Sequence, residues 1–431
     1  MPIKVLHTSD WHLGAMLHSE DRKEEHRQFL SWLLHTIKNE HIDVLVVAGD
    51  IFDVYAPSGA AQKLYYDFLA GLIKLENGPE VFIVAGNHDS QHFLDAPAGI
   101  LSKLKIHVIS TVDTEKPEDF IFKIKCGTGE TGLAVCAIPF LREKDLKVTV
   151  NARKSDGGDS LSAQYNKAAA AFYHKVYNIA KTENIPVLMT GHFYLDGGKK
   201  SDDYSERTRE IGNLQSLPAA MLPDADYYAL GHLHNSQAVS GKNHIRYSGS
   251  PLQMSFSEAE TEKFVVIAEF DAASAEKKPS IRTEPVPVWQ ELRQITGSPD
   301  TILEALKHIK ESGRKVWLSV NVTEYDGVLF DFWNTLEREM EAASARELPL
   351  TEPEIMFEPS YRILVRQDAR DRQNNGDWRD RDESVDLLSL DPSAVFQKFL
   401  LEEKVTTEDS VIFMKMFNEL YNDVIVSENG A

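Results

Sequence analysis

Five short segments of the chain carry the side chains that a metal site requires. Each segment follows an apolar, β-rich run and opens at a glycine or at Ser-Asp. The segments are Asp10-Trp11-His12, Gly49-Asp50, Gly86-Asn87-His88-Asp89, Gly191-His192 and Gly231-His232-Leu233-His234. In an α/β sheet, functional side chains gather beyond the carboxyl ends of the strands. The ordered set therefore predicts one site to which all five segments contribute.

The side chains in these segments suit a pair of divalent cations. The donors are Asp10, His12, Asp50, Asn87, His192, His232 and His234, and no thiolate is among them. Two cations about 3.5–4 Å apart can clamp a phosphodiester and activate water. Oxygen and imidazole donors together favour Mn²⁺, Fe²⁺ or Zn²⁺ over an all-oxygen Ca²⁺ or Mg²⁺ cage. We expect two divalent metal ions, with Mn²⁺ as the first choice, and phosphodiesterase chemistry.

The elements that must position these residues begin with alternating strands and helices. The order is strand Ile3–Thr8, helix Glu24–Lys38, strand Asp43–Ala48, helix Gln62–Leu75 and strand Val81–Ala85. This order predicts a largely parallel sheet wrapped by helices. Further strands are expected at 120–124 and 133–138, and a helix at 164–181. Late strands at 245–247 and 263–270 are expected to complete a second sheet.

Length and composition describe an ordinary globular protein of two or three domains. The chain has 431 residues, of which 42% are hydrophobic, and no apolar run approaches the length of a bilayer span. The first residues resemble no export signal, so we expect a cytoplasmic protein with no membrane partner. With two cysteines, Cys126 and Cys136, it has no disulfide framework.

The charge of the chain is strongly negative, at −21. Proteins that coat nucleic acids neutralise phosphates with basic residues, so this charge argues against that class. It does not exclude a nuclease, because bound cations and a partner protein can supply positive charge.

A change of composition near Asp271–Pro287 predicts a boundary between residues 1–275 and a small α+β domain at 285–366. A charged linker at 367–389 then leads to a helix pair at 390–426. Its apolar residues include Val395, Phe396, Phe399, Leu400, Met414, Phe417 and Leu420. Two such short helices cannot bury this surface between them, which favours a docking module for a partner over helices folded back on the core.

The five segments resemble the motifs D-x-H, GD, GNH[DE], GH and GHxH of the calcineurin-like metallophosphoesterases. Other stretches resemble the SbcD family of bacterial nucleases within that superfamily, strongly over residues 1 to about 270. They are Thr8–Gly14, Gly49–Asp53, Ala85–Ser90, Ile138–Arg142, Ala229–His234, Tyr247–Pro251 and Ser255-Phe256. The resemblance implies an α/β fold, a metallophosphoesterase α/β/β/α sandwich, with a small capping domain and a C-terminal helix pair.

The resemblance also implies roles for the site residues. One metal would bind Asp10, His12 and His234, the other would bind Asn87, His192 and His232, and Asp50 would bridge them. His88 would not bind metal but would face the scissile phosphate, with Asp89 as its orienting partner. Apart from the resemblance, we expect Asp53 to be a supporting or capping residue and not a ligand.

The function implied is a metal-dependent DNA nuclease, a duplex exonuclease and single-strand or hairpin endonuclease. It would act in DNA repair and recombination with an SMC-like ATPase, SbcC, docked on the C-terminal helices. Helices such as Gln62–Leu75 would pair two copies into a homodimer within a heterotetramer.

Two other functions use the same residues. A phosphoprotein phosphatase or a small nucleotide phosphodiesterase would need the same site, and the acidic charge favours it. The residues after 270 argue against it, because a minimal phosphatase needs neither a cap nor an exposed helix pair. A non-catalytic scaffold is the second of these alternatives, and the complete donor set argues against it.

Overall fold

The computed structural model describes residues 2–127, 129–147, 161–199, 216–271, 274, 277–312, 315–323, 332 and 361–368. The expected linker beyond Asp368 and the expected helix pair at 390–426 lie outside these residues. Residues Met1–Gln367 form one compact unit of the chain. In the part of the chain that is described, no helix is long and apolar enough to cross a membrane.

A first sheet carries the expected parallel strands. Its strands, in spatial order, are β14 (Ser280–Pro285), β13 (Phe264–Phe270), β1 (Ile3–Thr8), β4 (Val44–Ala48), β5 (Glu80–Val84) and β6 (Ile106–Ile109). Strands β1, β4, β5 and β6 run parallel to one another, while β13 and β14 pair antiparallel at the other edge. The expectation that 263–270 belongs to the second sheet is wrong, because β13 pairs with β1 in the first.

A second sheet lies against the first. Its strands, in order, are β11 (Gln237–Val239), β12 (Lys242–Tyr247), β10 (Tyr227–Gly231), β9 (Val187–His192), β8 (Thr131–Cys136) and β7 (Ile121–Lys125). The four inner strands run parallel, and β7 and β11 close the edges with antiparallel pairs. The carboxyl ends of β9 and β10 therefore lie at one end of this sheet.

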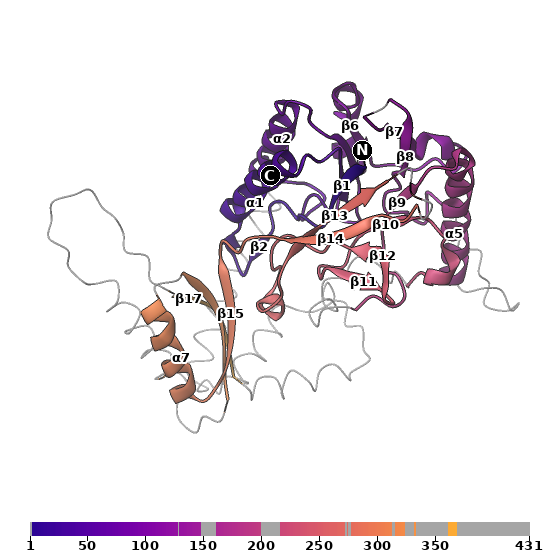
Figure 1. Ribbon diagram of the computed structural model, residues 1–431. Helices are drawn as coiled ribbons and strands as arrows, with labels where there is room; N and C mark the ends of the chain where they lie inside the picture. The colour runs from indigo at the N-terminus through magenta and orange to yellow at the C-terminus, as the bar shows by residue number, and fades with distance from the viewer. Residues whose placement is uncertain are drawn as a thin grey trace, which may run out of the picture. The chain divides into compact units, whose positions relative to one another are not determined.

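Helices cover the outer faces of both sheets (Figure 1). Helices α1 (Lys23–Glu40) and α2 (Gly59–Ile73) pack on the first sheet and α5 (Leu161–Ala180) on the second. In β4, Leu45 and Val47 face the helices, whereas Val44 and Val46 face the second sheet. Because this strand is covered on both sides, its sequence is continuously apolar. The layers confirm the expected α/β/β/α sandwich.

Short elements connect the larger ones. They are β2 (Met16–Leu17), β3 (Glu20–Asp21), α3 (Gln91–Asp95), α4 (Ala98–Leu101) and the 3₁₀ turns η1 (Ser102–Leu104), η2 (Pro117–Phe120), η3 (Lys181–Glu183), η4 (Ala219–Met221) and η5 (Phe256–Glu258).

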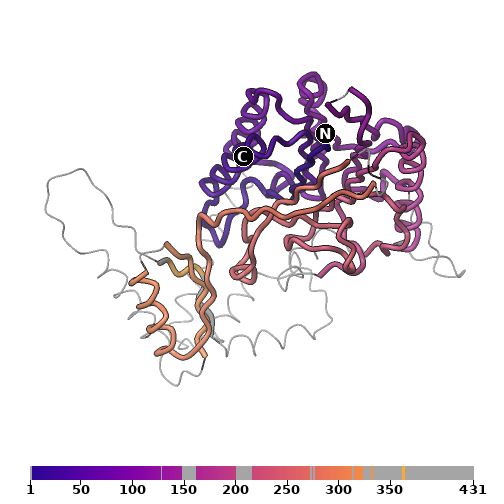
Figure 2. The backbone as a smooth tube through the Cα atoms, viewed as in Figure 1, coloured from indigo at the N-terminus to yellow at the C-terminus, as the bar shows by residue number. Residues whose placement is uncertain are grey.

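The chain continues from β14 into a smaller α+β unit, which consists of a three-stranded sheet and one helix (Figure 2). This sheet has the order β15 (Glu291–Gly297), β16 (Val316–Val322) and β17 (Tyr361–Asp368), with α7 (Pro299–Ser312) on one face. The strand β14 lies inside the segment Asp271–Pro287, where composition predicts a boundary, and extends the first sheet. The division at 275–285 stays a prediction.

Candidate metal centre

The predicted site residues follow strands whose carboxyl ends meet between the two sheets. Asp10 follows β1, Asp50 follows β4 and Asn87 follows β5 in the first sheet; His192 ends β9 and His232 follows β10 in the second. Neighbouring strands that run parallel have their carboxyl ends at the same edge of the sheet. The topology therefore brings together residues that are more than 200 positions apart in sequence.

Glycines let these strand ends approach closely. A Cβ on Gly231 would lie 1.9 Å from the carbonyl oxygen of Ala48, and a Cβ on Gly49 would lie 2.2 Å from His192 Nδ1. A Cβ on Gly86 would lie 2.1 Å from Asp50 Oδ1. No side chain fits at such distances, which explains why a glycine precedes each of these site residues.

Four site residues have left-handed backbone conformations. Their φ angles are 51° at Asp10, 46° at His12, 51° at Asp50 and 99° at His232. A non-glycine residue in this region costs on the order of 1–3 kcal/mol and persists where its surroundings fix it. Here Asp10 N donates to the Gly49 carbonyl at 2.9 Å and His12 N to the Asp50 carbonyl at 3.0 Å. The loops after β1 and β4 thus hold each other in place.

The structure brings all seven expected donors together. Two clusters, Asp10–His12–His234 and Asp50–His192–His232, each have their ligand atoms within 4.8 Å of one another. Asn87 Oδ1 lies 3.0 Å from His192 Nε2 and 3.1 Å from His232 Nδ1.

Asp50 belongs to the second cluster and also faces the first. Its Oδ2 is 3.1 Å from His192 Nε2 in one cluster and 3.8 Å from His12 Nε2 in the other. A single carboxylate is therefore within reach of both groups of donors.

The side chain of His12 tests whether these residues fit a cation. It is buried, its Nδ1 lies 3.3 Å from Asp53 Oδ1, and its Nε2 makes no hydrogen bond to the protein. Buried polar atoms are rarely left without a partner, because desolvation is then uncompensated. By contrast, His192 Nδ1 donates to the Ala48 carbonyl at 2.8 Å, which turns its Nε2 toward Asp50 and Asn87 in the site. Both arrangements suit imidazole ligands of a metal ion.

Carboxylates and imidazoles at the centre shift one another's pKa values. Burial alone would raise the pKa of Asp50, but the surrounding imidazoles, His192 above all, hold it well below its usual range. Burial alone would lower the pKa of His192, but the Asp50 carboxylate leads the contacts that raise it to about 9. Burial and the charge of Asp50 raise the pKa of Asp89 to about 6, against three amides that favour its ionised form. The centre thus holds negative and positive groups in contact.

His88 is oriented differently from the sequence-based expectation. Its Nδ1 lies 2.7 Å from the Asp53 carbonyl oxygen, and its backbone amide donates to Asp50 Oδ1 at 2.9 Å. The Asp89 carboxylate accepts instead from the amides of Gly86 at 2.8 Å, Phe52 at 3.0 Å and Ile51 at 3.2 Å. The expectation that Asp89 orients His88 is therefore wrong, because the Asp89 carboxylate fixes the two loops that carry the site.

Asp53 lies at the edge of the centre. Its carboxylate is 3.3 Å from His12 Nδ1, and its ligand atom clusters with those of His12 and His88. The supporting role expected for Asp53 is compatible with this contact and stays a prediction.

Sequence reasoning misses several residues that touch the donors. Ser9 donates to Asp10 Oδ2 and pairs with Ser248 at 2.8 Å, and Glu258 Oε1 lies 3.5 Å from His234 Nδ1. Ser248 and Glu258 lie in or beside the stretches 247–251 and 255–256, which stand out in the sequence only through the family resemblance. The polar residues in and beside these two stretches are the signal that could have pointed to Ser248 and Glu258.

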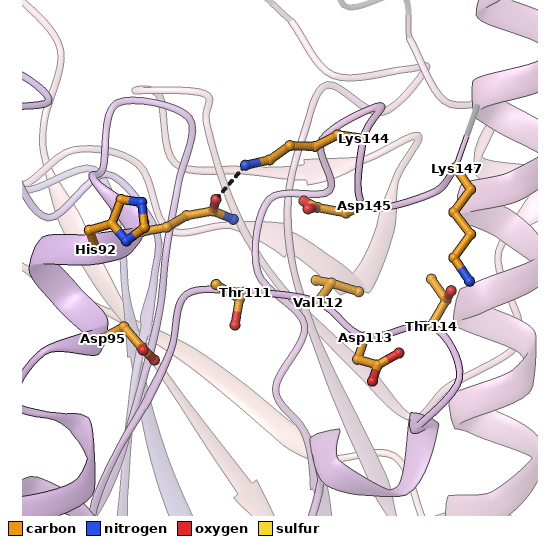
Figure 3. A pocket seen from close by; sticks show the side chains of 10 residues that line it. His92, Asp95, Thr111, Val112, Asp113, Thr114, Lys144, Asp145 and Lys147 are labelled. Atoms are coloured by element: carbon orange, nitrogen blue, oxygen red, sulfur yellow. Dashed lines mark hydrogen bonds between the residues drawn. The ribbon is translucent and has the colours of Figure 1, made fainter. Parts of the chain in front are cut away.

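A separate hollow of about 490 Å³ lies beside α3 (Figure 3). Its lining consists of Gln91, His92, Asp95, Thr111, Val112, Asp113, Thr114, Lys144, Asp145 and Lys147. Lys144 donates to Gln91 Oε1 at 3.0 Å. Two lysines face three aspartates, so the hollow has no strong charge preference, and it includes none of the expected site residues.

Fold and site together define a calcineurin-like phosphoesterase, and the model of that family matches residues 3–236, more than half of the chain. Curated relatives narrow the class. The SbcD component of the nuclease SbcCD from Escherichia coli K12 is 34% identical over 329 residues, covering 74% of this chain and 78% of that protein. The corresponding protein is 35% identical in Bacillus subtilis strain 168, covering 69% and 71%, and 32% identical in Rhodobacter capsulatus, covering 71% and 76%. The chain belongs to the SbcD nuclease family; it is a phosphodiester hydrolase that binds divalent metal.

Proposed function

We propose that this protein cleaves DNA as a duplex exonuclease and as an endonuclease on single strands and hairpins. It would act in DNA repair and recombination, in the bacterial cytoplasm at the nucleoid. The observation that carries the proposal is the convergence of seven metal donors at the meeting point of two sheets, in a chain of the SbcD family.

The cofactors in this proposal are two divalent cations, with Mn²⁺ preferred. Asp10, His12 and His234 would hold one, Asn87, His192 and His232 the other, and Asp50 would contact both. Such cations neutralise phosphate charge and activate water. The mixture of carboxylate, amide and imidazole donors supports Mn²⁺ over Ca²⁺ or Mg²⁺.

His88 would act on the substrate. A carbonyl oxygen only accepts hydrogen bonds, so the contact with Asp53 places a proton on His88 Nδ1 and leaves Nε2 for the substrate. From there His88 would stabilise charge on the phosphate or protonate the leaving 3′ oxygen. Its side chain is partly exposed, as such a role requires.

The decisive experiment compares substrates and metals. Metal-free protein is loaded with Mn²⁺, Mg²⁺, Zn²⁺ or Fe²⁺ and assayed on linear duplex DNA, hairpin DNA, a chromogenic phosphodiester and a phosphopeptide. We expect Mn²⁺ to give the highest activity and DNA to be the preferred substrate. Rapid turnover of the phosphopeptide or the chromogenic ester, with no cleavage of DNA, would establish the phosphatase or small phosphodiesterase alternative.

An SMC-like ATPase, SbcC, is the proposed protein partner, docked on residues 390–426. The support is that the curated relatives are named as one component of the SbcCD nuclease, together with the apolar pattern of those residues in the sequence. A chain ending after Ser389 keeps β17 and the linker at 367–389. It should keep metal content and unstimulated nuclease activity but lose co-purification with the ATPase. Binding at full strength would place the docking site elsewhere.

A homodimer within a heterotetramer is also proposed. On α2, Tyr66 and Ile73 are exposed hydrophobic side chains, which supports pairing through this helix. Sedimentation analysis of the wild type and of Ile73→Asp tests it: the variant should become monomeric, and an unchanged dimer would move the interface away from α2.

A further inference from the structure

A buried ion pair lies directly behind His234. Glu258, in η5, and Lys263, just before β13, are each only 2–3% exposed. Glu258 Oε2 accepts from Lys263 Nζ at 2.6 Å and from Met254 N at 3.0 Å. Its other oxygen, Oε1, lies 3.5 Å from His234 Nδ1. One carboxylate thus faces both a lysine and the imidazole of an expected metal donor.

Lys263 holds the backbone of the same histidine. Its Nζ donates to the His234 carbonyl at 3.0 Å and to Ser250 Oγ at 3.1 Å, in addition to Glu258. An ammonium group has three donors, and all three are used here. Ser250 N also donates to the His234 carbonyl at 3.0 Å. The ring and the backbone of His234 are therefore fixed by one connected set of contacts.

Stability alone is a weak reason for such a pair. The desolvation of two buried charges often exceeds their mutual attraction, and apolar residues of the same size would serve as well. A carboxylate facing one nitrogen of a histidine has a distinct effect. It keeps the proton on that nitrogen, turns the ring and makes the other nitrogen a better ligand.

The two donor clusters differ in this respect. His192 in the second cluster has a neutral partner, the Ala48 carbonyl. His234 in the first cluster has a carboxylate partner. We propose that Glu258 and Lys263 are positioning residues for His234 and set the affinity of the cation site formed with Asp10 and His12. This inference rests on the proposed role of His234 as a ligand.

The test uses full-length protein and measures metal binding directly. Metal-free wild type, Glu258→Gln and Lys263→Met are titrated with Mn²⁺, followed by calorimetry and by the electron paramagnetic resonance of unbound Mn²⁺. We expect two sites in each protein. One should bind about 10–100-fold more weakly in the variants, the usual effect of losing an outer contact to a ligand, and the other should be unchanged. Glu262→Gln removes the same charge from an exposed side chain on the same loop, and this variant should match wild type.

A double variant separates positioning from folding. Glu258→Gln with Lys263→Met removes both buried charges, so its melting temperature without metal should approach that of wild type. The weaker site should nevertheless stay weak. If affinity returned together with stability, or if both sites had weakened equally, the pair would act only through folding and the inference would be wrong.

His234→Ala is measured in parallel to test the underlying assignment. It should lose one cation. If it bound two cations as tightly as wild type, His234 would not be a ligand, and the proposed ligand set would fail. If it lost one cation while Glu258→Gln and Lys263→Met bound both normally, the ligand set would stand and the positioning role would be refuted.

Discussion

Individual side chains at the centre depend on backbone conformations that few residues adopt. Asp50 has a φ of 51° and is clamped through His88 N, which donates to its Oδ1. Its other oxygen faces both donor clusters. The position of this carboxylate is therefore determined by two loops at once, which suits a group shared by two cations.

We predict that Asp50→Ala abolishes nuclease activity and eliminates binding of at least one of the two Mn²⁺ ions, because a shared donor is removed. Metal content after dialysis and activity on duplex DNA are the measurements. Asp67→Ala, which removes an exposed carboxylate paired with Lys63 on α2, is the control and should behave as wild type. Two tightly bound ions in an active Asp50→Ala protein would contradict the bridging role.

His88→Ala should separate catalysis from metal binding. We predict metal content near that of wild type and turnover lower by about 10²–10⁴-fold, the usual loss when a general acid or base is removed. His92→Ala, an exposed histidine four residues further on, provides the control. Loss of metal in parallel with activity would make His88 a ligand.

At the level of elements, the strand-to-loop turns are the vulnerable parts of the site. A Cβ on Gly86 would lie 2.1 Å from Asp50 Oδ1 and 2.3 Å from Asp50 N. We predict that Gly86→Ala displaces the loop after β4 and lowers Mn²⁺ affinity at least 10-fold. Gly99→Ala in α4 meets nothing within 4 Å and should leave affinity unchanged. Wild-type affinity in Gly86→Ala, measured by titration, would show that the two loops are not tightly coupled.

The buried elements can be predicted from sequence, whereas the edges cannot. Strand β1 has the expected bounds and β4 differs by one residue, because runs rich in apolar residues are typical of strands that are covered on both faces. Strand β14 escapes prediction since Ile281 is its only strongly apolar residue and most of its side chains are exposed. The pairing of β13 with β1 spans the whole first domain, and no local pattern encodes it.

The same distinction applies to the site. Donors that directly follow strands can be found from sequence, because strand direction fixes where they lie. Glu258 cannot, since its contact with His234 depends on a loop 24 positions away in sequence. The sequence suggests that Asp89 orients the ring of its neighbour His88, but the ring turns to Asp53 and the carboxylate to three amides. Adjacent loop residues can point to opposite sides.

At the scale of the whole molecule, one histidine outside the donor set connects the two sheets. His7 in β1 is fully buried between them: its Nε2 donates to the Leu230 carbonyl at 3.1 Å, and its Nδ1 lies 3.0 Å from the Tyr227 hydroxyl. A neutral ring with its proton on Nε2 satisfies both contacts. Burial, with a smaller effect of Arg246, lowers the pKa of His7 to about 3.

This histidine should make folding sensitive to acid. The unfolded chain binds a proton at His7 below about pH 6.5, whereas the folded chain does not until about pH 3, so stability is full above 6.5 and falls as the pH is lowered between these values. We predict that His7 contributes up to about 1.4 kcal/mol per pH unit to this loss. In metal-free protein, urea unfolding of His7→Gln should show a shallower dependence from pH 6 to 4 than wild type, because the amide carries no titrating proton and can replace both contacts. His35→Gln on the exposed side of α1 should keep the wild-type slope, and an equally steep slope in His7→Gln would assign the acid sensitivity to other groups.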